Sequence, residues 1–306
     1  MPAVYYGPYG VQYETYAEPA GGNTGTRPLG HHLILPDGRV YAYALNDGTV
    51  EVAGRLYQSV ASVADHFNVV ADVARAIGAT VISATLGATL AAVDIYSEGV
   101  AHTNDLIGES YTYSIKRARA VAEAHAAAAA SAVLTVNLQA GDTVQVALDT
   151  TSEITFTRNR FHSVLLHPSP PTALLAGVSP GVAAADRYYW SQISGYAAVL
   201  ADGTLLAGLP VQASITTDGA VENAKRRVRT GSTAAADSTA GVLLEDQDGN
   251  EVNVRIFTLA VDTTADISGP ILINAPLVGM CVKANATGDE ALINLMYLDA
   301  YGPSRA

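Results

Sequence analysis

The 306-residue sequence is long enough to bury the core of one large β domain or two ordinary ones. Its 29 acidic and 17 basic side chains give a net charge of −12, which repels a phosphate backbone, so we expect no direct nucleic-acid partner. The single cysteine, Cys281, excludes an intramolecular disulfide, and its apolar neighbours predict a buried thiol. Charged residues are only 15% of the chain, so small polar residues and tyrosine must supply much of the surface, which suits protein–protein contacts.

Residues 1–30 contain five tyrosines spaced among glycines and prolines, with no helical or alternating period. These are Tyr5, Tyr6, Tyr9, Tyr13 and Tyr16. Because disordered tails are usually poor in aromatic residues, we interpret the segment as an extended arm that buries its rings against another subunit, in preference to a frayed terminus. It lacks the basic start and apolar stretch of a signal peptide, and we expect synthesis in a cytoplasm.

From His31 onward, short apolar runs alternate with Asp-Gly pairs, which favour tight turns between antiparallel strands. The pairs are Asp37-Gly38, Asp47-Gly48, Asp202-Gly203, Asp218-Gly219 and Asp248-Gly249. We expect three strands joined by two turns over residues 33–54, and further strand–turn–strand units over 197–214 and 241–261. The pattern predicts a mainly β fold, with one or more antiparallel domains that resemble a β-sandwich or barrel and at most one or two short helices.

Two segments permit a helix. Residues 57–77 fit a helix and strands equally well, because their valines lie near helical spacing but also favour extended structure. Residues 116–133 are rich in alanine and predict one helix. The longest apolar stretch, 124–134, is far shorter than the roughly 20 residues that a membrane span needs, so no membrane role is expected.

A cluster of prolines, at Pro168, Pro170, Pro171 and Pro180, interrupts regular structure and predicts the main internal boundary. It divides the chain after the arm into a β-rich domain, 31–168, and a β-rich lobe, 169–306, which either stand apart or pack as one unit. The apolar C-terminal run 277–301 is strand-like and is expected to close a sheet.

No set of residues forms a coherent catalytic or metal-binding pattern. Ser194 and Gly195 lack the preceding glycine of a nucleophile elbow, the seven histidines lack metal-ligand spacing, and no glycine-rich loop has the form of a phosphate-binding motif. We therefore expect no catalytic residue, no metal ion, no cofactor and no enzymatic activity. The basic cluster within 225–229 is interpreted as a solvated face or a set of interface ion pairs, in preference to a nucleic-acid contact.

Trp190 is the single tryptophan and follows two tyrosines. Such a cluster can stack a sugar, but packing in a core or an interface is the commoner use of a lone tryptophan. Trp190 therefore joins the five tyrosines of the arm as a predicted interface residue.

Two segments carry a resemblance to a known group of proteins. Residues 188–221, YYWSQISGYAAVLADGTLLAGLPVQASITTDGAV, and residues 35–58, LPDGRVYAYALNDGTVEVAGRLYQ, resemble virion structural proteins of tailed bacteriophages, especially of aquatic phages. The group includes capsid decoration, or cement, proteins, and residues 278–298 look like its C-terminal strand. Over much of residues 30–300 the resemblance is a general similarity of sequence pattern. It is specific only in these stretches and contains no catalytic signature.

The resemblance implies a decoration protein on the outer capsid surface that binds the major capsid protein as a homotrimer and stabilises the head. It would be synthesised in the cytoplasm of a bacterial host. Two alternatives remain open within the same assembly. One is the major capsid protein itself, which usually has a long charged helix, and the other is a tail or fibre protein that binds host glycans.

Overall fold

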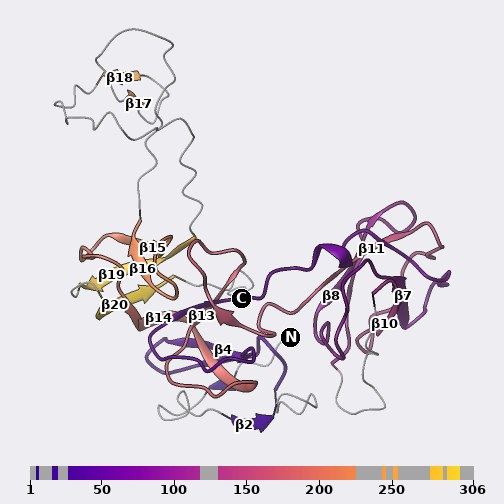
Figure 1. Ribbon diagram of the computed structural model, residues 1–306, viewed down its shortest axis with the longest axis horizontal. Coiled ribbons are helices and arrows are strands. Elements are labelled where there is room, and N and C mark those ends of the chain that lie inside the picture. The colour runs from indigo at the N-terminus through magenta and orange to yellow at the C-terminus, as the bar shows by residue number, and fades with distance from the viewer. Residues whose placement is uncertain are drawn as a thin grey trace. The chain divides into compact units, whose positions relative to one another are not determined.

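The computed structural model describes residues 5–6, 16–19, 27–117, 130–224, 243–245, 251–253, 276–284 and 288–296. The chain divides into two compact units, which are Met1–Asn223 with Ala275–Ala306, and Ala224–Asn274 (Figure 1). In the second unit, the described strands are β17 (Leu243–Glu245) and β18 (Glu251–Asn253), which pair antiparallel.

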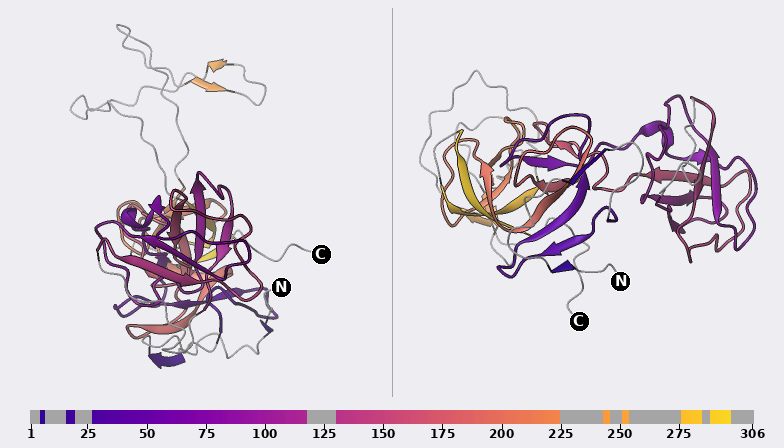
Figure 2. Two further views of the ribbon diagram at one scale, coloured as in Figure 1. Left: turned by 90° about the vertical axis from the view of Figure 1, so that its right-hand side faces the viewer. Right: turned by 90° about the horizontal axis from the view of Figure 1, so that it is seen from below.

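The fold is mainly β and mainly antiparallel, as the sequence predicts. The largest sheet contains β1 (Tyr5–Tyr6), β2 (Tyr16–Pro19), β3 (His32–Ile34), β4 (Val40–Leu45), β5 (Leu56–Gln58), β12 (Leu165–Leu166), β13 (Leu175–Val178), β14 (Arg187–Leu200), β15 (Pro210–Ala213), β16 (Val221–Asn223), β19 (Leu277–Lys283) and β20 (Glu290–Leu295). The sheet curls into a half-barrel (Figure 2). Within the described part of the chain, one turn of 3-10 helix, η2 (Ala64–His66), is the only helical element.

The 14-residue strand β14 connects the two halves of this sheet. Its first half pairs with β4, from Tyr188 opposite Leu45 onward, and its second half pairs with β20. The change of partner occurs at Gly195, whose φ of +85° is a conformation that favours glycine. A Cβ at this position would also lie 3.0 Å from the Cα of Arg39. Glycine therefore lets one continuous strand serve two neighbours.

Three groups of buried residues lie along the large sheet. The first joins the inner faces of β14, β15, β19 and β20 through residues such as Val199, Ile293 and Leu295. The second packs β4, β5 and β13 with the segment around Phe161. The third is aromatic and lies along β3, β4 and the start of β14.

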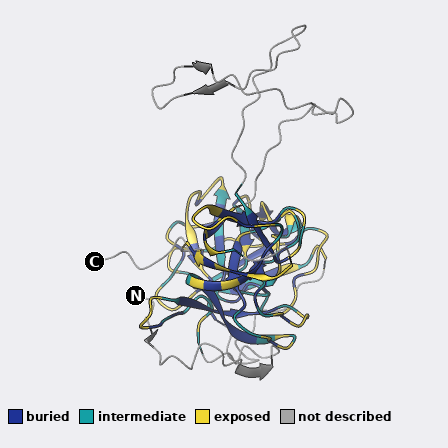
Figure 3. Cartoon of the chain, turned by 90° about the vertical axis from the view of Figure 1, so that its left-hand side faces the viewer, coloured by how far each residue is buried: buried dark blue, intermediate teal, exposed yellow. Residues whose placement is uncertain are grey.

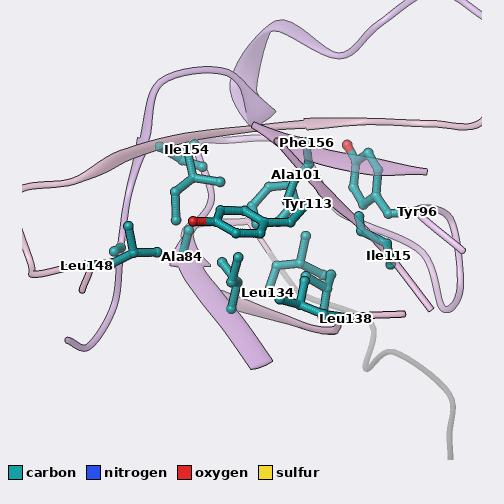
Figure 4. Packing of buried hydrophobic residues seen from close by; sticks show 14 of the residues in the cluster. Ala84, Tyr96, Ala101, Tyr113, Ile115, Leu134, Leu138, Leu148, Ile154 and Phe156 are labelled. Carbon is teal, nitrogen blue, oxygen red and sulfur yellow. The ribbon is translucent and has the colours of Figure 1, made fainter. Parts of the chain in front are cut away.

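A separate core is formed by residues 69–156. It lies between two small antiparallel sheets, one containing β6 (Val69–Val70), β11 (Glu153–Thr157), β8 (Val100–Asp105) and β9 (Thr112–Ser114), and the other containing β7 (Val81–Thr85) and β10 (Val133–Asn137). Tyr113, Phe156, Ile115 and Leu134 converge in this core (Figure 4). Strict alternation of buried and half-exposed residues in β10 and β11 places one face of each strand against it.

Three of the Asp-Gly pairs join antiparallel neighbours as predicted. Asp37-Gly38 connects β3 with β4, Asp218-Gly219 connects β15 with β16, and Asp248-Gly249 falls between the paired strands β17 and β18. The glycines at 38 and 219 have φ of +87° and +70°, the conformation that such turns require.

The other two pairs do not form the predicted hairpins. After β4, Asn46 donates through Nδ2 to the carbonyl oxygens of Thr49 and Ala184, which holds the chain in a loop, and Glu51 makes only an isolated bridge with Ala183. The expected third strand of the 33–54 meander is therefore absent. Asp202-Gly203 likewise does not pair β14 with β15, because β20 and β19 lie between these two strands.

The C-terminal run does complete the sheet, as β20 pairs with β14 and with β19, which in turn pairs with β15. The prolines at 168–171 do not separate the chain into two sheets, since β5 pairs with β12, which precedes them, and with β13, which follows them. The division into 31–168 and 169–306 stays a prediction. The predicted helix at 116–133 falls largely on residues 118–129, which lie outside the described residues. Residues 57–77 form β5, η2 and β6 with loops between them.

Candidate interaction surface

The outer face of β14, β20 and β19 exposes apolar side chains side by side. In β20, Ala291, Ile293 and Leu295 point into the core, whereas Leu292 and Asn294 point outward. A half-buried antiparallel strand normally carries polar residues at its outward positions. Leu292 departs from this pattern, and so do Tyr196 of β14 and Met280 of β19.

The register of the three strands brings these side chains together. Tyr196 lies opposite Asn294, which lies opposite Met280, and Ala198 lies opposite Leu292 in a neighbouring row. Directly opposed residues on one face have Cβ atoms about 5 Å apart. The side chains of these two rows are therefore neighbours on one continuous surface.

We define the outer apolar surface as Tyr196, Ala198, Met280, Val282, Leu292 and Met296. The exposed fractions are 57% for Tyr196, 40% for Met280 and 38% for Leu292. The side of the molecule that carries β19 and β20 faces the viewer in Figure 3, where exposed residues run along the strands between buried ones. Two polar side chains lie within this surface: Asn294 lies between Tyr196 and Met280, and Lys283 lies opposite Leu292. An exposed apolar patch that contains a few polar side chains is compatible with a protein–protein interface.

Gly279 permits the close strand packing below this surface. A Cβ added at Gly279 would lie 2.2 Å from the carbonyl oxygen of Asn294 on β20. Real Cβ atoms do not approach a backbone oxygen so closely, so any larger residue would push β19 away from β20. The glycine thus fixes the spacing between Met280 and its neighbours on β20.

Trp190 lies in the core and is only 1% exposed. Its ring meets the ring of Tyr43 edge-on at 5.1 Å between centroids, and Tyr43 in turn stacks on Tyr188 at 5.2 Å. The guanidinium carbon of Arg27 lies 5.8 Å from the centre of the Trp190 ring. Trp190 therefore contributes packing within the chain and offers no face to a glycan or a second subunit, because it packs in one buried cluster with Leu33 of β3, Tyr43 of β4 and Tyr188 of β14.

The arm carries the other predicted interface residues. The backbone of β1, with Tyr5 and Tyr6, pairs parallel with β3, and β2, which begins at Tyr16, pairs antiparallel with the start of β14. Both strands thus add to the sheet of their own chain. Tyr9 and Tyr13 lie outside the described residues. Burial of the tyrosine rings against a second subunit stays a prediction.

One carboxyl group is buried without a good hydrogen-bond donor. Glu51 is 1% exposed, and neither of its carboxylate oxygens accepts a hydrogen bond of good geometry. Burial raises the pKa of Glu51 to about 8; the nearby hydroxyl groups of Tyr189 and Ser179 lower this pKa only in part, and Asp47 raises it further. The Ser179 hydroxyl donates instead to the carbonyl oxygen of Gly181 at 2.6 Å. The fold therefore holds Glu51 in its neutral form near pH 7.

The histidines and the cysteine have structural surroundings. The two ring nitrogens of His167 lie 2.8 and 3.0 Å from the carbonyl oxygens of Pro168 and Ala220. Cys281 is buried as predicted, and burial raises the pKa of its thiol. In the described ranges, no three His, Cys, Asp or Glu side chains are grouped so that they would hold a metal ion. The basic cluster within 225–229 lies outside those ranges.

Comparison with protein-family models, with curated proteins and with solved structures finds no match to this chain. None of the helices that the structure describes has the length and apolar character that crossing a membrane requires. The outer apolar surface was not predicted from the sequence. The sequence feature that indicates it is the run Leu292-Ile293-Asn294-Leu295-Met296, in which apolar residues occupy both faces of an otherwise alternating strand.

Proposed function

We propose that this chain is a structural protein of a bacteriophage virion, a decoration or cement protein that binds the outside of the major capsid protein lattice. The observation that carries the proposal is the outer apolar surface, an exposed hydrophobic patch at fixed spacing on a rigid sheet. Contiguous exposed apolar patches on soluble proteins mark binding sites for other proteins. The resemblance of residues 35–58 and 188–221 to virion proteins supports the major capsid protein as the partner.

The surface is suited to a lattice partner. Complete burial of one large apolar side chain contributes about 1.5–3 kcal/mol, so each half-exposed side chain of this surface has about 1 kcal/mol left to gain. A single contact of this strength gives only a weak binding free energy. A homotrimer would present three copies to one site on the shell, and simultaneous contacts raise the overall affinity far above that of one copy. The bound protein stabilises the shell because it binds only the assembled form.

Host-glycan binding through Trp190 has no support in the fold, because that ring is enclosed by the chain itself. The major capsid protein remains the competing assignment within the virion. It differs from a decoration protein in location, since it forms the shell that the decoration protein covers.

Cryo-electron microscopy of virions that contain the chain tests the assignment directly. We expect density for the β fold on the outer surface of the head, above a continuous shell formed by another protein. A position in the tail, inside the head or in the shell itself would exclude the decoration function.

A sedimentation assay tests the surface. Purified protein is mixed with heads assembled without it, and bound protein is measured in the pellet. The triple variant Tyr196→Ser, Met280→Ser and Leu292→Ser loses about 3 kcal/mol of burial, which predicts about 100-fold weaker binding. The control replaces three exposed apolar residues elsewhere, Ile77→Ser, Leu90→Ser and Val93→Ser, whose side chains are 69%, 63% and 55% exposed, and should bind like the wild type. Equal binding by both triple variants would show that another face meets the capsid.

A further inference from the structure

The Asp-Gly pairs of this chain have a chemical property beyond their use as turns. In such a pair, the nitrogen of the glycine can attack the carboxyl carbon of the aspartate, because glycine has no side chain to block the approach. The reaction has two structural requirements. The carboxyl group must lie beside the glycine amide, and that amide must not be held in a hydrogen bond. Four of the five pairs lie among the described residues and can be compared on these two points.

The carboxyl groups of Asp37 and Asp47 have the same placement. Oδ1 of Asp37 accepts a hydrogen bond from the Arg39 amide at 3.0 Å, and Oδ1 of Asp47 accepts one from the Thr49 amide at 2.9 Å. An aspartate that bonds to the amide two residues further along forms an Asx-turn, which holds its carboxyl group alongside the intervening peptide. In both turns, the intervening amide belongs to the glycine. Both pairs therefore meet the first requirement.

The two pairs differ in the glycine amide. The amide of Gly38 donates to the carbonyl oxygen of Leu35 at 3.0 Å within the turn between β3 and β4. The amide of Gly48 makes no hydrogen bond within the part of the chain that the structure describes, and Gly48 is exposed. The Gly38 nitrogen must give up a hydrogen bond before it reacts, whereas the Gly48 nitrogen does not.

The second carboxyl oxygen distinguishes the same two pairs. Oδ2 of Asp37 accepts a hydrogen bond from Nε of Arg39 at 2.6 Å. Desolvation acts to raise the pKa of Asp37, but the hydrogen bonds and the charge of Arg39 outweigh it, and the net shift is downward. Because the carboxyl group must be protonated for its hydroxyl to leave as water, this shift slows the reaction. Asp47 accepts hydrogen bonds only through Oδ1 among the described residues, from the amide and the hydroxyl of Thr49.

The other two described pairs each lack one requirement. Oδ2 of Asp202 accepts hydrogen bonds from the hydroxyl groups of Ser214 and Thr216, which tie this carboxyl group to the connection between β15 and β16. In the remaining pair, the amide of Gly219 donates to the carbonyl oxygen of His167 at 3.1 Å, and Gly219 is buried. Of the four described pairs, Asp47-Gly48 is thus the one that meets both requirements.

We propose that Asp47-Gly48 is a site of spontaneous covalent modification, at which Asp47 isomerises to isoaspartate faster than the other described Asp-Gly pairs. The Gly48 nitrogen bonds to Cγ of Asp47 and loses its proton, and the carboxyl hydroxyl leaves as water, which closes a succinimide ring. A water molecule then adds to one of the two ring carbonyl carbons and breaks its bond to nitrogen. Cleavage at Cγ restores aspartate, whereas cleavage at the main-chain carbonyl carbon gives isoaspartate. Water is released and consumed, and nothing is oxidised or reduced.

Isoaspartate changes the loop that follows β4. It adds one methylene group to the main chain at Asp47, whose amide donates to the carbonyl oxygen of Val164 and whose carbonyl oxygen accepts from the amide of Asp186, both at 2.9 Å. These two hydrogen bonds cannot both keep their geometry in a longer chain. The same loop leads to Glu51, whose amide donates to the carbonyl oxygen of Ala183 at 2.8 Å. The modification therefore weakens the attachment of the segment that buries Glu51.

Prolonged incubation of the full chain at neutral pH in water enriched in oxygen-18 tests the site. Each succinimide that opens takes up one oxygen-18 atom, and cleavage after Arg39 and Arg55 releases residues 40–55, in which Asp47 is the only aspartate. Fragmentation that distinguishes isoaspartate from aspartate locates the product. Isoaspartate should form at Asp47 about five times faster than at Asp37, the factor that corresponds to one hydrogen bond. Equal rates at the two residues, or no isoaspartate at Asp47, would overturn the proposal.

Two controls separate the effect of the fold from that of the local sequence. In concentrated urea neither turn is formed, so Asp37 and Asp47 should isomerise at similar rates. A difference as large as that in the folded chain would show that flanking residues set the rate, and would overturn the structural argument. The variant Gly48→Ala has open space for its Cβ and needs no positive φ, so it should fold normally and form isoaspartate more slowly. An unchanged rate in this variant would contradict attack by the amide at residue 48.

Discussion

Replacement of Glu51 by glutamine should remove a large part of the pH dependence of stability. The folded chain raises the pKa of Glu51 from 4.5 to about 8, mainly through burial. The folded state therefore holds this proton more tightly than the unfolded chain does. The resulting stabilisation is complete below pH 4.5 and is lost as the pH rises through about 8.

The magnitude follows from the two pKa values. Each pH unit between them costs about 1.4 kcal/mol of unfolding free energy, so the whole interval corresponds to about 5 kcal/mol. Between pH 5 and pH 9, the wild-type protein should lose about 4 kcal/mol through this one group. Glutamine has the same shape as the neutral carboxyl group and does not ionise. The Glu51→Gln variant should therefore lose none of this unfolding free energy between pH 5 and pH 9.

Urea unfolding followed by fluorescence at pH 5, 6, 7, 8 and 9 measures the effect. The difference in unfolding free energy between variant and wild type should grow by about 4 kcal/mol across the series, in favour of the variant. Glu109→Gln, at an exposed position, is the control and should run parallel to the wild type. Parallel curves for Glu51→Gln as well would refute the reasoning. Titration of the labelled Glu51 carboxyl carbon by NMR checks the pKa in the folded protein independently.

Two further substitutions test the packing. Trp190→Ala should lower the unfolding free energy by about 3–5 kcal/mol because it opens a cavity beside Tyr43 and Tyr188. Tyr196→Ala on the outer apolar surface should cost less than about 1 kcal/mol. Chemical denaturation compares the two variants, and similar losses would contradict the assigned burial. Gly279→Ala should cost about 1–3 kcal/mol because its Cβ would meet the Asn294 carbonyl oxygen. Hydrogen exchange should then show faster exchange in β19 and β20, and unchanged protection there would argue against the close approach.

The sequence contained enough to predict the class of fold and several local connections. Asp37-Gly38 and Asp218-Gly219 formed turns between adjacent strands because a tight turn depends on the conformations of two to four consecutive residues. The burial of Cys281 was predictable for a similar reason, since its immediate neighbours are apolar. Such features depend on short-range interactions, which neighbouring residues specify.

The candidate surface could not be predicted in this way. Tyr196, Leu292 and Met280 are distant in sequence and become neighbours only because β20 pairs with β14 and β19. Nothing in the residues around Asp202-Gly203 indicates that the C-terminal hairpin is inserted between the strands on either side of that turn.

Alternation and turn chemistry are local properties, and they were sufficient to predict a cysteine-poor, mainly antiparallel β protein with tight Asp-Gly turns. The enclosure of Trp190 and the exposure of Leu292, by contrast, follow from the pairing of strands that are distant in sequence. The physical reason is that an apolar or charged residue has the same intrinsic preference at every position. Its surroundings, and therefore its function, depend on which distant strands pair beside it.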